Sequence, residues 1–309
     1  MCLQSSRQIE KLGLYTIREL KMDSSSRWWD DFKLAESEAG HWCIGPFELW
    51  ARRSPGAWIF ARRSIEDEAA ASVDVEIPAP SGDFPEGREG WEHSRFGFSR
   101  SRAEARLRPM LPDRSLVVKP EMPLVLPAGE DVTFYVGLPL WISFEQGPER
   151  TELWQAPLVR PSDTWFGSLT GQGELCYAAR TRAIFDRKNL LPRPNRAVGQ
   201  IHVRNRASGP LPMDGLKLPL QNMSLFICGD GLLWTETVTL QRDDEDEMAA
   251  LRFSEGPPSD LKNPVLVSPP RTTPSKGILV RAFDGLLSIR GGIDGIRHHR
   301  SRGSGVIDP

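Results

Sequence analysis

The chain has 309 residues, with 39 Lys and Arg, 41 Asp and Glu, and a formal net charge of −2. This near-neutral balance argues against nucleic acid or an anionic membrane surface as a partner, because both attract strongly basic proteins. The 27 Gly and 26 Pro are scattered at short intervals, which favours many short strands over long helices.

Both ends of the chain are polar. We expect a flexible N-terminal arm over residues 1–27 and a disordered tail over residues 291–309, because such segments bury too little apolar surface to fold. The start, MCLQSSRQIEKLG, lacks the apolar core of a signal peptide, and no stretch approaches the roughly 18 apolar residues of a membrane span. These features predict a cytoplasmic protein with no integral membrane segment.

Closely spaced aromatic residues begin at Trp28, and residues 28–115 are predicted to form an aromatic-rich N-terminal β segment. Within it, LWARRSPGAWIFARR has two apolar stretches around Ser54-Pro55-Gly56, a pattern typical of a hairpin with a tight loop. The Pro-, Gly- and charge-rich stretch over residues 77–93, IPAPSGDFPEGREGWEH, is predicted to be a linker and the first boundary in the chain.

Two further β modules are predicted over residues 116–190 and 191–290. In the second module, Gly229-Asp230-Gly231 separates two apolar runs and predicts a hairpin, and the acidic run at 243–247 predicts a solvated loop. Sheets this short must pack face to face to bury their apolar sides. The predicted fold is therefore all-β, with two packed antiparallel β-sandwich-like modules and little helix.

The densest group of turn residues and special side chains lies in PSDTWFGSLTGQGELCYAARTRA, which begins at Pro161. Asp163 precedes Trp165 here, which indicates either a turn capped by side-chain oxygens or a surface loop that stacks Trp165 on a ligand. From Glu174 to Phe185 the side chains alternate with period two, which predicts a strand. Arg180 and Arg182 then share one face with small apolar residues.

A second strand is predicted over LLWTETVTL, where the same period places Glu236 on a face with Trp234 and Val238. An unpaired buried carboxylate costs several kcal/mol, so Glu236 is expected to pair with Arg180 or Arg182. Two interpretations remain open. The three residues form a structural ion pair, or the arginines clamp an anion while Glu236 acts as a general base.

Common catalytic and cofactor motifs are absent from the sequence. It has no dinucleotide fingerprint, no phosphate-binding loop and no GxSxG elbow. The four cysteines form no CxxC pair, and the five histidines lack metal-site spacing. We therefore assign no catalytic residue and expect no metal and no cofactor.

Three stretches carry a resemblance to a known family: PSDTWFGSLTGQGELCYAARTRA, IHVRNRASGPLPMDGLKLPL and LWTETVTL. Together they resemble the uncharacterised prokaryotic family catalogued as domain of unknown function 432, over about Trp28 to Leu287. The family has no assigned activity, so the resemblance implies a shared fold and leaves the function open.

The leading functional hypothesis is a non-catalytic cytoplasmic β-sandwich module for binding or assembly. Its expected partner is another protein or a second copy, because sheet edges accept added strands. The alternative is an enzyme that acts on an anionic or sugar-like small molecule. The candidate ligand- or partner-binding residues are Asp163, Trp165, Arg180, Arg182 and Glu236. A concave pocket around the two arginines and the glutamate would favour the enzyme.

Overall fold

The computed structural model describes residues 27–65, 70–122, 124–167, 173–181, 183–213, 215–243, 248–273, 278–281 and 283–284. Apart from Arg27, the predicted arm lies outside these residues, and so does the predicted tail. Of the predicted acidic loop, only Asp243 is described.

The fold is all-β, as predicted. The strands are β1 (Asp31–Lys33), β2 (Ala39–Ile44), β3 (Phe47–Ser54), β4 (Ala57–Ser64), β5 (Val73–Ala79), β6 (Glu92–Gly97), β7 (Glu104–Met110), β8 (Leu116–Pro120), β9 (Leu124–Leu126), β10 (Asp131–Pro139), β11 (Trp141–Gln146), β12 (Thr151–Pro157), β13 (Ser162–Phe166), β14 (Glu174–Thr181), β15 (Arg196–Asn205), β16 (Leu211–Met213), β17 (Gly215–Leu218), β18 (Leu225–Ile227), β19 (Leu233–Trp234), β20 (Val238–Arg242), β21 (Met248–Phe253), β22 (Val265–Ser268), β23 (Ile278–Arg281) and β24 (Phe283–Asp284). Helical turns in the described residues are the short 3-10 segments η2 (Ser81–Asp83), η3 (Arg187–Asn189) and η4 (Leu220–Asn222). None of the helices described there has the length and hydropathy needed to cross a bilayer.

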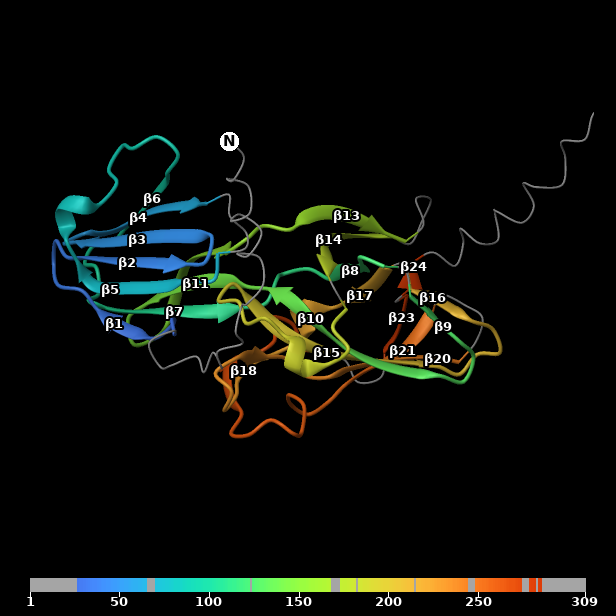
Figure 1. The fold of residues 1–309 in the computed structure, drawn as a ribbon. Helices are drawn as coiled ribbons and strands as arrows, with labels where there is room; N and C mark the ends of the chain where they lie inside the picture. The colour runs from blue at the N-terminus through green and yellow to red at the C-terminus, as the bar shows by residue number, and fades with distance from the viewer. Residues whose placement is uncertain are drawn as a thin grey trace, which may run out of the picture.

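Two sheets form an N-terminal sandwich (Figure 1). One has the strand order β5-β2-β3-β4-β6, and the other has the order β1-β7-β11-β12. Aromatic side chains fill the space between them. The ring of Phe144 on β11 lies 5.0 Å from that of Trp58 and 4.6 Å from that of Phe60, both on β4. The Trp58 indole donates a hydrogen bond to Gln146 across the same core, so alternate residues of facing strands join the two sheets.

The predicted linker over residues 77–93 is not a boundary. It begins in β5 and ends in β6, which are the two edges of one five-stranded sheet. The residues between these strands, 80–91, cross the outer face of that sheet, and we call them the strap. Phe84 anchors the strap because its ring is buried, packs edge-on against Trp50 and lies under the Arg52 guanidinium. Aromatic burial here outweighs the turn-forming tendency of Pro and Gly.

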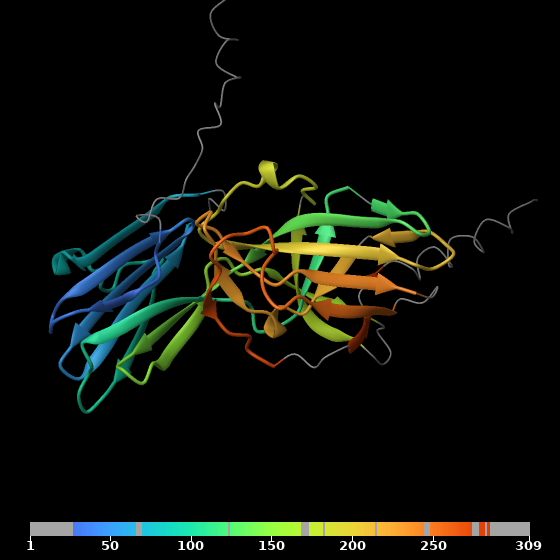
Figure 2. The ribbon, with the colours of Figure 1, turned by 90° about the horizontal axis from the view of Figure 1, so that it is seen from below.

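The C-terminal lobe contains an eight-stranded sheet, with β10 paired to β15, and a five-stranded sheet of order β13-β14-β8-β17-β24 (Figure 2). Most pairs are antiparallel, but β14 pairs parallel to β8, and β15 pairs parallel to β19 and β20. Along β15, Ile201, Val203 and Asn205 point into the core and are fully buried. The Asn205 side-chain nitrogen donates to the carbonyls of Leu126, Pro127 and Gly209, whereas its Oδ1 atom has no hydrogen-bond partner among the described residues.

Sheet membership does not follow the predicted segment boundaries. From the range 116–190, β11 and β12 belong to the N-terminal sandwich, whereas β8 and β10 pair with β17 and β15 of the range 191–290. The Trp28 indole also donates to the carbonyl of Pro194 in the other lobe.

Both predicted hairpins are present. Pro55 and Gly56 form the two-residue connection between β3 and β4. Gly229-Asp230-Gly231 connects β18 to β19, and Gly231 adopts a φ of 79°, which glycine tolerates without strain.

Candidate functional site

A cleft of about 380 Å³ opens near the ends of β8 and β14 in the C-terminal lobe. We call it the basic cleft. It is lined by Lys119, Pro139, Val159, Arg160, Pro161, Ser162, Ala178, Ala179, Arg180, Asn195 and Arg196. Its lining contains four cationic side chains and no carboxylate, imidazole or thiol. Four cationic side chains in one cleft can attract an anion.

Two of these cations lie directly opposite each other. β8 and β14 run parallel in a register that pairs Lys119 with Arg180. Both side chains are exposed, and neither forms an ion pair with a carboxylate of the described residues. Like charges at facing positions of a strand pair destabilise the sheet. This pair therefore carries an electrostatic cost that an anion in the cleft would remove.

The β13–β14 hairpin carries three of the five predicted site residues. Asp163 is not among the residues that line the cleft, but its carboxylate accepts hydrogen bonds from the lining residue Arg160 at 3.3 Å and from Arg114 at 3.4 Å. Trp165 is 48% exposed and lies opposite Leu175. Arg180 lines the cleft itself. The strand that carries it ends at Thr181, not at Phe185 as predicted, and Arg182 lies outside the described residues.

Asn195 contributes a buried acceptor to the cleft wall. The residue is only 2% exposed, and its Oδ1 atom has no hydrogen-bond partner among the described groups. An unsatisfied buried acceptor costs about 1–3 kcal/mol. A donor that reached this atom would remove that cost. No local sequence pattern identifies Asn195, because its position in the cleft depends on the packing of distant strands.

Glu236 does not lie in the basic cleft, and the predicted strand around it is interrupted. Val198 pairs with Trp234 and Ile201 pairs with Val238, so three steps along β15 match four steps along the partner segment. The extra residue shifts the period-two phase and leaves Glu236 between β19 and β20.

The Glu236 carboxylate accepts a hydrogen bond from the backbone N–H of Ser224 at 2.8 Å. No described residue forms an ion pair with it, so the expected contact with Arg180 is absent there. Burial raises the pKa of Glu236, and the hydrogen bond from Ser224 only partly opposes this. The predicted set of two arginines and one carboxylate is therefore not assembled among the described residues.

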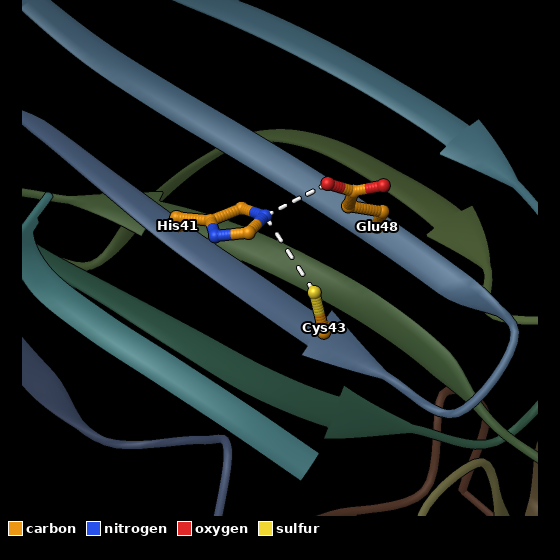
Figure 3. Close-up of side chains that lie close together, drawn as sticks. All are labelled: His41, Cys43 and Glu48. Atoms are coloured by element: carbon orange, nitrogen blue, oxygen red, sulfur yellow. Dashed lines mark hydrogen bonds and ion pairs between the residues drawn. The ribbon is translucent and has the colours of Figure 1, made fainter. Parts of the chain in front are cut away.

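A second group of polar side chains lies close together on β2 and β3 of the N-terminal sandwich (Figure 3). It is on the strap side of the sheet, because His41 stacks on Trp50, which packs against Phe84 of the strap. We call His41, Cys43 and Glu48 the outer cluster. The tight turn at Gly45 and Pro46 joins β2 to β3 and sets Cys43 opposite Glu48. His41 Nε2 lies 2.9 Å from Glu48 Oε1 and 3.5 Å from Cys43 Sγ.

The surroundings of the outer cluster hold it in place. The His41 ring stacks on Trp50 with 4.2 Å between ring centroids. Arg63 donates from Nε to Glu48 Oε2 at 2.7 Å. Burial raises the pKa of the Cys43 thiol, and the nearby Glu48 carboxylate raises it further. The sequence signal for the group is His-x-Cys on one strand with Glu across a two-residue turn, a pattern without ordinary metal-site spacing.

The other described cysteines, Cys176 and Cys228, are buried free thiols. Burial raises the pKa of Cys176 to about 12 and that of Cys228 to about 11. Thiols with such pKa values contain almost no thiolate at neutral pH, so neither residue is suited to act as a nucleophile.

Comparisons with known proteins identify one family. The family model described as "Protein of unknown function (DUF432)" matches residues 28–288, which agrees with the resemblance in the sequence. No curated protein and no solved structure matches the chain.

Proposed function

We propose that this chain, which belongs to the DUF432 family, is a non-catalytic binding module that holds a small hydroxylated anion in the basic cleft. The observation that carries the proposal is the facing pair Lys119 and Arg180, which lack described carboxylate partners beside a cleft of about 380 Å³. Cavities of roughly 300–1,000 Å³ are typical of small-molecule sites.

Charge selects the anionic part of the proposed ligand. A carboxylate or phosphate between Lys119 and Arg180 would replace a repulsion with two attractions. The planar guanidinium of Arg180 can donate two parallel hydrogen bonds to such a group. Arg196 lines the same cleft and donates to the carbonyl of Gly137 at 3.5 Å.

Asn195 selects the hydroxylated part. Its buried Oδ1 atom can accept a hydrogen bond but cannot donate one. A ligand that carries a hydroxyl next to its acidic group, such as a sugar phosphate or a sugar acid, supplies both the charge and the donor. A plain anion supplies only the charge.

The composition of the cleft supports binding over catalysis. Ser162 is the one hydroxyl in the lining, and no carboxylate or imidazole lines the cleft to activate it. The enzyme hypothesis needs Glu236 as a base, but Glu236 does not line the cleft and its carboxylate is engaged by Ser224.

Calorimetric titration of the full chain tests this function. The probes are glucose 6-phosphate, glucuronate, inorganic phosphate and neutral glucose. We expect the two hydroxylated anions to bind more tightly than phosphate and glucose not to bind. Arg180→Ser should weaken binding about tenfold, since a charge-assisted contact is lost. Arg95→Ser, which removes an exposed arginine of β6, should leave binding unchanged. Equal loss in both variants, or no binding of any anion, would refute the function.

The exposed hairpin supports a second binding role. β13 is an edge strand in the described part of its sheet, and its Trp165 lies opposite the half-exposed Leu175. Edge backbone next to exposed apolar side chains favours strand addition by another protein or a second copy. Sedimentation velocity should show self-association that Trp165→Ser weakens and that Phe185→Ser, at another exposed aromatic residue, does not. Association unaffected by Trp165→Ser would contradict this role.

We also propose a cytoplasmic location, supported by the free thiols of Cys43, Cys176 and Cys228. Subcellular fractionation tests it, and recovery of the native protein outside the cytoplasm would refute it.

A further inference from the structure

The geometry points to a metal site in the outer cluster, separate from the basic cleft. We propose that His41, Cys43 and Glu48 bind one divalent cation of borderline softness, with Zn²⁺ as the best match. One imidazole, one thiolate and one carboxylate are the three ligand types that zinc accepts in proteins.

The distances between the ligand atoms agree with tetrahedral zinc. Typical Zn–N and Zn–S bond lengths place a nitrogen and a sulfur ligand about 3.5 Å apart, and a nitrogen and an oxygen ligand about 3.4 Å apart. The observed separations are 3.5 Å between His41 Nε2 and Cys43 Sγ, and 2.9 Å between His41 Nε2 and Glu48 Oε1. The nitrogen–oxygen pair is thus about 0.5 Å closer than in a zinc site, and all three ligand atoms lie within 4.8 Å of one another.

The hydrogen-bonding capacity of His41 also favours a cation at this place. The His41 Nε2 atom faces both the Glu48 carboxylate and the Cys43 sulfur. In neutral histidine this atom carries one hydrogen or one lone pair, so it can make a good contact with one of these neighbours at a time. A cation at the meeting point of the three atoms satisfies all of them together.

The surroundings already resemble those of a metal site, where outer groups orient the ligands. Arg63 engages Glu48 through Oε2 and leaves Oε1 turned towards His41. The Arg63 guanidinium is itself held over the Trp91 ring at 4.5 Å. The stack on Trp50 fixes the imidazole plane. The ligands therefore come from two paired strands and are held before the ion arrives.

Two exposed acidic residues of the neighbouring strand β5 strengthen the site. Asp74 lies opposite Cys43, and Glu76 lies opposite His41. Their charges attract a cation to this face of the sheet. Three protein ligands leave a fourth zinc position for water or for a small ligand, as in zinc sites that are not closed.

Cobalt titration of the full, reduced and metal-stripped protein tests the proposal. Co²⁺ bound by a thiolate gives a sulfur-to-metal charge-transfer band and tetrahedral visible bands. We expect one Co²⁺ per chain with these bands, displaced by one equivalent of Zn²⁺. Cys43→Ser should abolish the charge-transfer band and weaken Zn²⁺ binding at least tenfold. Cys228→Ser, which alters a buried cysteine of the other lobe, should change neither.

Two further variants keep the test decisive if Cys43→Ser does not fold, as judged by circular dichroism. His41→Gln and Glu48→Gln each remove one ligand, and each should weaken Zn²⁺ binding at least tenfold while keeping the β spectrum. Arg180→Ser should bind Zn²⁺ normally, which separates this site from the proposed function. Absence of the charge-transfer band in the natural protein, or its persistence in Cys43→Ser, would overturn the proposal.

Discussion

The outer cluster and the basic cleft differ in how their charges are balanced. In the outer cluster, the Glu48 carboxylate has Arg63 on one oxygen and His41 on the other. In the basic cleft, Lys119 faces Arg180 and no carboxylate lines the wall. A ligand of the outer cluster must therefore compete with existing contacts, whereas a ligand of the cleft replaces repulsion. Charged side chains thus attract one another in the outer cluster and repel one another in the basic cleft.

The two regions also differ in how the chain assembles them. The outer cluster is local, because one tight turn brings β2 against β3. The basic cleft is not local, because it needs β8 and β14 to pair in parallel across 61 residues, from Lys119 to Arg180. Loop closure over that distance costs entropy, so the cleft depends on the whole lobe being folded.

Removal of Glu48 should produce the largest effect on stability. Glu48→Ala leaves Arg63 and His41 without their carboxylate partner, and we expect a loss of about 2 kcal/mol in the free energy of unfolding. Urea unfolding of the metal-free protein measures it.

Glu92→Ala is the matched control, because it breaks the ion pair of Arg62 at a side chain that is 75% exposed. Exposed pairs contribute little, so the control should change stability by less than about 0.5 kcal/mol. Equal losses in the two variants would mean that the contacts of Glu48 contribute no more to stability than an exposed ion pair does.

In the absence of ligand, removal of a cleft cation should not lower the free energy of unfolding, in contrast to removal of Glu48. Arg180→Ser relieves the repulsion with Lys119, and we expect unchanged stability or a gain of up to about 0.5 kcal/mol. At a ligand concentration of about ten times the dissociation constant, the natural protein should gain about 1.4 kcal/mol, and the variant should lose most of that gain. Thermal unfolding with and without glucose 6-phosphate measures both effects. Clear destabilisation of the ligand-free variant would show that Arg180 has a structural role.

The sequence predicts the parts of this fold that depend on neighbouring residues. Turn chemistry identifies the hairpin at Pro55 and Gly56 and the hairpin at Gly229-Asp230-Gly231. The strap is predicted as a linker because its Pro and Gly content gives no sign that Phe84 is buried against Trp50.

The candidate site is less predictable, because its residues meet through strand order and register. Three predicted residues do fall on the β13–β14 hairpin, where turn signals and special side chains are dense. Asn195 enters the cleft from a distant loop, and nothing in its local sequence points to Arg180. The face predicted for Glu236 is wrong for a local reason. One extra residue between β19 and β20 interrupts the period-two alternation from which that face is assigned.

Replacement of Glu236 should change stability only slightly, and the direction of the change depends on pH. Burial raises the pKa of Glu236 in the folded protein, so folding favours the protonated form. Its contribution to stability is therefore complete below the ordinary carboxyl pKa and is lost as the pH rises through the raised folded value. Glu236→Gln cannot ionise, and its amide oxygen can still accept from Ser224.

We expect Glu236→Gln to match the natural protein in acid and to become more stable by less than about 1 kcal/mol at neutral pH. Urea unfolding at several pH values measures the difference. A loss of about 3 kcal/mol at neutral pH would instead indicate a buried ion pair. It would restore Arg182, which lies outside the described residues, as the partner of Glu236. The backbone N–H of Ser224 can donate either to the carboxylate of Glu236 or to the amide oxygen of the Glu236→Gln variant. The sign of the change in the free energy of unfolding at neutral pH therefore separates an unpaired carboxylate from a buried ion pair.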